Sequence, residues 1–191
     1  MGPSLTPPPS RPRDHAQRLF LALWPDEAAR QALAAWMTGW QWPAGARVVP
    51  PQRLHLTLHF LGAVPSSRLP ALERGLAVPA EPIELRFAAP TRWARGLVVL
   101  EPEEVPPALT ALHERLAAAL RALALPVEAA VWRPHVTLAR QAAGAVAPPE
   151  ALALRWRSAG YALVGSQDGY HDLARYAALR RQSPVLPSDD S

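Results

Sequence analysis

One six-residue phrase occurs twice in this chain, as Arg53-Leu-His-Leu-Thr-Leu58 and as Arg133-Pro-His-Val-Thr-Leu138. Within each copy polar and apolar residues alternate, as they do in a strand with one buried face. Because successive side chains on a strand point to opposite faces, the His and the Thr of a copy share one face. We therefore expect two similar strands whose polar side chains meet in one cleft, namely His55, Thr57, His135 and Thr137.

The length of the chain limits how such strands can be housed. Its 191 residues suffice for one ordinary domain or for two small lobes that share a core. No apolar run approaches the ~20 residues that span a bilayer, and the first residues carry Pro and Arg instead of an apolar signal segment. Heptads and long apolar surface stripes are also missing from the pattern. We expect a cytoplasmic monomer with no membrane contact and no obligate protein partner.

The composition excludes several kinds of chemistry. The chain contains no cysteine, which excludes disulfides, thiolate nucleophiles and cysteine-ligated metals. All 20 basic residues are arginine, so Schiff-base and lysyl-adenylate intermediates cannot form, and a Walker-type phosphate loop would lack its lysine. The net charge of +4 favours an anionic ligand, because guanidinium groups bind phosphate bidentately. A biased coding composition explains the arginines equally well, so charge alone leaves nucleic-acid binding open.

The predicted elements describe one domain between two tails. Residues 1–16 and 182–191 are rich in proline and lack an apolar period, so we interpret them as flexible tails around a single bilobal domain at 17–181. Apolar periodicity predicts helices at 24–40, 67–77 and 107–123. It predicts strands at 18–23, 47–49, 54–61, 83–88, 97–100, 131–138, 154–165 and 170–178. This order favours an α+β fold in which two pseudo-symmetric lobes of antiparallel strands, with flanking helices, surround a central cleft.

Two histidines and two threonines on such strands suit the cleavage of a phosphodiester without a metal. One group must remove a proton from the attacking oxygen, another must protonate the leaving oxygen, and neutral donors must hold the remaining phosphate oxygens. Histidine titrates near neutral pH, so one ring can be neutral while the other is protonated. A Thr two residues after a His lies roughly 6.5 to 7 Å further along the same face, within reach of the same phosphate.

The paired motifs resemble those of the 2H phosphoesterases. In particular, the segments Arg18–Glu27, His55–Gly62 and Arg133–Arg140 are similar to the bacterial and archaeal RNA 2′,3′-cyclic phosphodiesterases, also called 2′-5′ RNA ligases. The resemblance extends over roughly residues 18–176, including a final strand at Gly169–Tyr176. It implies hydrolysis of an RNA 2′,3′-cyclic phosphate, or of a small cyclic nucleotide, to a 2′-phosphate without a cofactor. It also implies the reverse reaction, an ATP-independent 2′-5′ ligation.

The resemblance further assigns roles to individual residues. His55 would be the proton donor to the leaving 3′ oxygen, and His135 the proton acceptor that activates water. Thr57 and Thr137 would bind phosphate oxygens, and Arg140 would neutralise the phosphate. Sequence alone does not order the two histidines.

His59 departs from the usual pattern of these relatives, which more often carry Arg or a small residue at this place. It has the same strand parity as His55 and Thr57, so on a regular strand it would face the cleft and contact phosphate or base. The alternative is a partly exposed residue at the rim.

Other interpretations of the same residues stay open at this stage. A His or Thr on a strand is often structural, and Arg53 and Arg133 could support the strands or flank the cleft. His113 would lie at the edge of the apolar stripe of its helix, and any of the seven Trp residues could stack on a base. A zinc site would need ligands at short spacings that only His59 offers, so we predict no metal. The competing function is a non-catalytic module that binds RNA ends or phosphorylated nucleotides.

Overall fold

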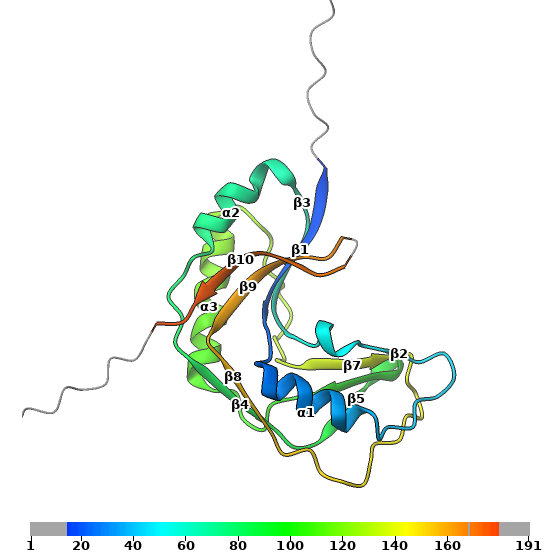
Figure 1. Ribbon diagram of the computed structural model, residues 1–191. Coiled ribbons are helices and arrows are strands. Elements are labelled where there is room, and N and C mark those ends of the chain that lie inside the picture. Colours follow the sequence, from blue (N-terminus) through cyan, green and yellow to red (C-terminus); the bar gives the residue numbers. More distant parts are fainter. Residues whose placement is uncertain (1–14, 168, 180–191) are drawn as a thin grey trace, which may run out of the picture.

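The computed structural model describes residues 15–167 and 169–179 (Figure 1). Most of the two predicted tails therefore lies outside the described residues, while His15 and Ala16 already contact the sheet. The α-helices are α1 (Glu27–Met37), α2 (Leu69–Gly75) and α3 (Pro107–Ala122). The strands are β1 (Ala16–Leu23), β2 (Arg47–Val48), β3 (Leu56–Pro65), β4 (Ile83–Phe87), β5 (Pro90–Trp93), β6 (Leu97–Leu100), β7 (Val136–Arg140), β8 (Leu154–Ser158), β9 (Gly160–Gly165) and β10 (His171–Ala177).

The main sheet joins two similar halves through the two motif strands. Its order is β10-β9-β1-β3-β7-β6-β5, with β2 paired to β7, and every pairing is antiparallel. In each half the motif strand pairs with the strand that precedes a long helix, β3 with β1 and β7 with β6. The halves meet at a single residue pair, Leu56 opposite Val136. This arrangement confirms the predicted α+β fold with two pseudo-symmetric lobes.

Apolar side chains from both halves form one continuous core. The predicted leucine stripe of α3 is buried at Leu109, Leu112, Leu116 and Leu120. This helix packs across β3, and α1 packs on β8, which forms a separate two-stranded sheet with β4. Because the elements of one half rest on those of the other, the core fixes the two motif strands relative to each other. Among the described residues, no helix is long and apolar enough to cross a membrane.

The chain departs from the predicted elements in three places. The strand predicted at 154–165 is two strands, which turn at Gly160, where φ is 155° and a Cβ would lie 2.0 Å from the carbonyl oxygen of Tyr176. The strand predicted at 131–138 begins only at Val136, since Pro134 lacks the amide hydrogen that a ladder needs. The short edge strand β5 is absent from the prediction, because it has four residues and starts with a proline.

Candidate active site

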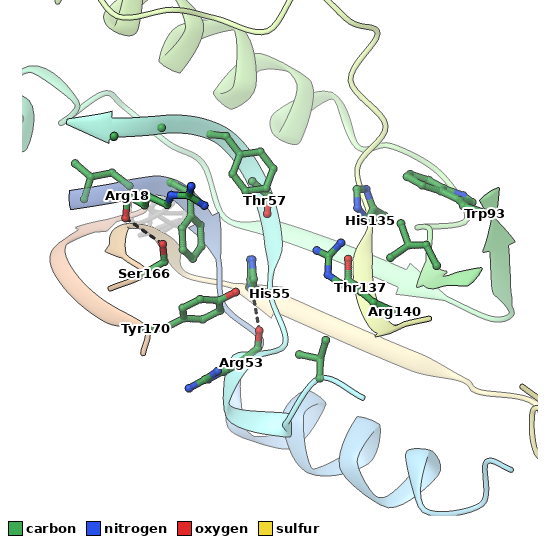
Figure 2. Close-up of a pocket in the computed structure, with 17 residues that line it drawn as sticks. Arg18, Arg53, His55, Thr57, Trp93, His135, Thr137, Arg140, Ser166 and Tyr170 are labelled. Atoms are coloured by element: carbon green, nitrogen blue, oxygen red, sulfur yellow. Dashed lines mark hydrogen bonds between the residues drawn. The ribbon is translucent and has the colours of Figure 1, made fainter. Parts of the chain in front are cut away.

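The single contact between the two motif strands lies at the centre of the site. Leu56 opposes Val136, and both side chains are buried, so the residues on either side of this pair point the other way. Because the strands are antiparallel, the His of one motif lies on the same side of the pair as the Thr of the other. The cleft is lined by His55, Thr57, His135 and Thr137 (Figure 2). The structure thus brings together the four side chains that the repeat predicts.

Each motif strand contains a β-bulge at the leucine of its motif. Thr57 opposes Ala22 while His59 opposes Leu21, which leaves Leu58 without a partner residue on β1. Likewise Val99 opposes Thr137 while Val98 opposes Ala139, so Leu138 is the extra residue. An extra residue reverses the alternation of side chains that follow it. The position that returns to the cleft is therefore the fifth after each His.

This reversal explains the positions of Arg140 and Phe60. Regular alternation from His135 and Thr137 would turn Arg140 away, but after the bulge Arg140 lines the cleft. Phe60 takes the equivalent place after His55 and lines the cleft with 57% of its surface exposed. The cleft therefore carries a cation after one motif and an aromatic ring after the other.

The same bulge makes the prediction for His59 wrong. His59 does not line the cleft but is 6% exposed and faces α3, where its Nε2 lies 2.9 Å from the carbonyl oxygen of His113. Its ring stacks on that of His113 at 4.1 Å, and His113 stacks in turn on Trp132 at 3.9 Å. The indole Nε1–H of Trp132 donates to the carbonyl oxygen of Thr57. His59 thus belongs to a structural stack behind the motif strand.

Aromatic rings surround His55. Its Nδ1 lies 2.6 Å from the carbonyl oxygen of Arg53, which leaves Nε2 for the cleft. Phe20, Trp24 and Tyr170 approach the imidazole with ring centroids 4.9, 5.5 and 5.3 Å away. Burial among these rings lowers the pKa of His55; the bond to the carbonyl raises it, and the nearby charges of His135 and Arg140 lower it further.

His135 has a similar anchor with a different surrounding network. Its Nδ1 lies 2.7 Å from the carbonyl oxygen of Arg133, and its ring lies 4.4 Å from that of Trp93. The Arg133 guanidinium in turn lies over Trp93, 4.4 Å from the ring centroid. Glu101 accepts from both, at 3.2 Å from Trp93 Nε1 and 2.7 Å from Arg133 Nη2. Arg133 therefore supports the aromatic wall and does not line the cleft itself.

The cleft has a volume of about 680 Å³, and the charged side chains among its described lining residues are Arg18, Arg53 and Arg140. The sequence pattern does not identify Arg18, Tyr170 or Trp93 as lining residues, because they come from β1, the β9–β10 connection and β5. Spacing along the chain does not reveal such neighbours. Within residues 15–167 and 169–179 no group of three or more His, Cys, Asp or Glu is placed to hold a metal ion.

Comparisons with known proteins agree with this geometry. Residues 15–164 match the model of the 2′-5′ RNA ligase superfamily. An RNA 2′,3′-cyclic phosphodiesterase of Thermus thermophilus is 36% identical over 169 residues, which cover 78% of this chain and 82% of the relative. The crystal structure of E. coli LigT complexed with 3′-AMP superposes with a TM-score of 0.77 at 26% identity, covering 86% of this chain and 99% of LigT. A second Thermus thermophilus structure gives a TM-score of 0.70 at 30% identity, covering 86% of this chain and all (100%) of that one. The repeated motif, the two-lobed sheet and these matches together show that the chain belongs to the 2′-5′ RNA ligase superfamily.

Proposed function

We propose that this protein hydrolyses the 2′,3′-cyclic phosphate at the end of an RNA, or of a small cyclic nucleotide, to a 2′-phosphate. One observation carries the proposal: two imidazoles are anchored through Nδ1 in the same way and line one cleft together with two hydroxyls and arginines. The anchor fixes each ring so that Nε2 is the nitrogen that exchanges a proton. Paired groups of this kind perform general acid and base catalysis.

The proposed step uses water as the nucleophile. Neutral His135 accepts a proton from water as the water oxygen bonds to phosphorus. The bond from phosphorus to the 3′ oxygen breaks on the opposite side, and protonated His55 donates a proton to that oxygen. The products are a 3′-hydroxyl and a 2′-phosphate, and the proton gained by His135 returns to His55 through solvent before the next cycle.

Thr57, Thr137 and Arg140 stabilise the phosphate during this step. The two hydroxyls donate hydrogen bonds to its non-bridging oxygens, one from each motif strand. The Arg140 guanidinium, next to Thr137 in Figure 2, offsets the negative charge that builds up on these oxygens. His59 has no part in the step, because it lies behind the strand.

The order of the two histidines follows from the family resemblance, and the electrostatics of the protein alone act against it. The lowered pKa of His55 favours its neutral form before substrate binds. Part of that lowering comes from the positive charges of His135 and Arg140. A bound anionic phosphate offsets both charges, so the substrate itself promotes protonation of its donor. Once protonated, a histidine with a low pKa is also the stronger acid.

Relatives support the nature of the substrate. The Thermus thermophilus relative is an RNA 2′,3′-cyclic phosphodiesterase, and LigT has been crystallised with 3′-AMP, phosphate, NADP+ and ATP. These ligands share a phosphate, and three of them contain a nucleotide base. We also propose the reverse reaction, in which a hydroxyl attacks the cyclic phosphate and forms a 2′-5′ bond. It needs no ATP, because the cyclic ester supplies the energy.

The test is to incubate the protein and EDTA with an oligoribonucleotide that ends in a 2′,3′-cyclic phosphate. Mass spectrometry detects the added water, and resistance of the product end to periodate identifies a 2′-phosphate. We expect His55→Ala and His135→Ala to lose about 10²- to 10⁴-fold in kcat. The exposed His171→Ala on β10, which does not line the cleft, serves as the matched control. Binding without turnover in the unaltered protein would show a non-catalytic module instead.

A second substrate tests the order of the histidines. Replacing the bridging 3′ oxygen with sulfur gives a leaving group that departs as a thiolate and needs no proton. This substrate should restore most of the rate of His55→Ala and leave His135→Ala inactive. Restoration of His135→Ala alone would reverse the two roles.

A further inference from the structure

Beside the catalytic cleft lies a smaller cavity with three arginines in its wall. It has a volume of about 260 Å³ and is lined by Arg47, Ala94, Arg95, Leu97, Arg140 and Gln141. Arg140 and Leu97 also line the catalytic cleft, so the two cavities adjoin at these residues. We call the smaller cavity the arginine annex. No acidic residue is among its described lining residues.

The annex concentrates positive charge without the usual compensation. Arg47 on β2 is directly opposite Arg140 on β7, at a Cα separation of about 5 Å in an antiparallel pair. Like charges in that position repel each other. The ion pairs found among the described residues involve other arginines, and none joins Arg47, Arg95 or Arg140 to a described carboxylate. An anion between these guanidinium groups would relieve the repulsion.

The backbone that presents the annex residues is also unusual. Arg95 and Gln141 have φ values of 60° and 54°, in the left-handed region that side chains other than glycine rarely adopt. They lie in two turns that touch each other, since the amide of Ala142 donates to the carbonyl oxygen of Gly96 at 2.8 Å. Strained positions that persist in a fold often belong to binding sites. Here both strained residues line the same cavity.

We propose that the arginine annex binds the phosphodiester on the 5′ side of the nucleotide whose cyclic phosphate is hydrolysed. This inference rests on the proposed function. A 2′,3′-cyclic phosphate occupies the 3′ end of the strand, so the remaining chain leaves the cleft through the 5′ oxygen of the same nucleotide. Arginine is suited to that next phosphate, because its planar guanidinium binds phosphate bidentately. The annex therefore makes the end of an RNA strand a better substrate than a cyclic mononucleotide.

The experiment compares three substrates of the full-length protein. They are a 2′,3′-cyclic mononucleotide, a dinucleotide with the same cyclic end, and that dinucleotide with a neutral methylphosphonate linkage. We expect kcat/KM for the charged dinucleotide to exceed that for the neutral one by about tenfold, as one charge-assisted contact would give. The slope of log(kcat/KM) against log[salt] should be steeper by about 0.7 for the charged dinucleotide.

Two variants remove the annex charge and spare the reaction. Arg47→Ala and Arg95→Gly should each reduce the advantage of the charged linkage, and the double variant should bring it within about twofold of unity. Hydrolysis of the mononucleotide should not change. Arg95→Gly suits the left-handed backbone, so a folding defect is not expected from it. Arg155→Ala on β8 removes an equal charge far from the cleft lining and should keep the full advantage.

The outcomes separate this inference from the proposed function. If none of the substrates is hydrolysed, the proposed function fails. If the mononucleotide is hydrolysed but the charged linkage gives no advantage, or the advantage survives in the double variant, the annex proposal is overturned. Figure 2 shows Arg18 on the other side of His55 from Arg140. Loss of the advantage in Arg18→Ala but not in the annex variants would place the strand at that opposite side and refute the proposal.

Discussion

The stack of His59, His113 and Trp132 should make the protein lose stability in mild acid. Burial lowers the pKa of His113 to about 4, and the neighbouring His59 acts in the same direction. In the unfolded chain this group returns to its ordinary value of 6.5. Below pH 6.5 the unfolded chain therefore takes up a proton that the folded protein accepts only near pH 4. The free energy of unfolding must fall as the pH drops through this window and level off below it.

The size of the effect follows from the two pKa values. At pH 5 a fully shielded group with these values would cost about 2 kcal/mol relative to pH 7. The His113 side chain is only partly buried, so solvent screening reduces the expected cost to about 1 kcal/mol. The matched variant is His113→Phe, which keeps an aromatic ring between its two stacking neighbours and cannot bind a proton.

Urea unfolding at pH 7 and pH 5 measures this cost. We expect the unaltered protein to lose about 1 kcal/mol more than His113→Phe between the two pH values. Carboxylates and His59 titrate in both proteins, so their effects cancel in the difference. Equal losses in the two proteins would refute the assignment of this acid sensitivity to His113.

Four further predictions concern the site and its support. Thr57→Val and Thr137→Val should each lower kcat/KM about 10- to 100-fold, since each removes a donor to a charged phosphate, and an unchanged value would exclude that donor. Trp93→Phe keeps a ring against His135 but loses the bond to Glu101, so kcat should fall by about twofold to fivefold at constant KM, with a larger loss in Trp93→Ala. Tyr161→Phe should lower the free energy of unfolding by about 1 to 3 kcal/mol in urea titrations, because its hydroxyl bonds to the backbone of residues 76 and 78. EDTA should leave the rate within about twofold, because the acid, the base and the phosphate ligands are all side chains; a lasting loss that zinc restores would contradict this.

The amino-acid sequence alone is sufficient to predict the family and the four central side chains. Alternation along a strand is a local property, so the repeated phrase by itself puts the His and the Thr of each copy on one face. Helix α3 is equally predictable, because its leucines recur at the helical period and are buried along one stripe. These predictions succeed because each depends on residues that are near one another in the chain.

Sequence fails where the pairing of strands decides which way a side chain points. A bulge exists only relative to a partner strand, so nothing in the local pattern distinguishes Leu58 and Leu138 from ordinary strand residues. The two bulges turn His59 out of the cleft and bring Phe60 and Arg140 into it. For Arg140 the family resemblance supplies the position that regular alternation would deny.

The chemistry of this protein is therefore determined by its sequence, and the environment of that chemistry by its tertiary structure. The repeat supplies the histidines and threonines, and the absence of lysine and cysteine excludes covalent alternatives. Only the folded sheet brings Tyr170 to His55, Trp93 to His135, and Arg47 opposite Arg140. These contacts join residues from distant parts of the chain, and they arise because burying both halves in one core aligns strands whose register no single segment specifies.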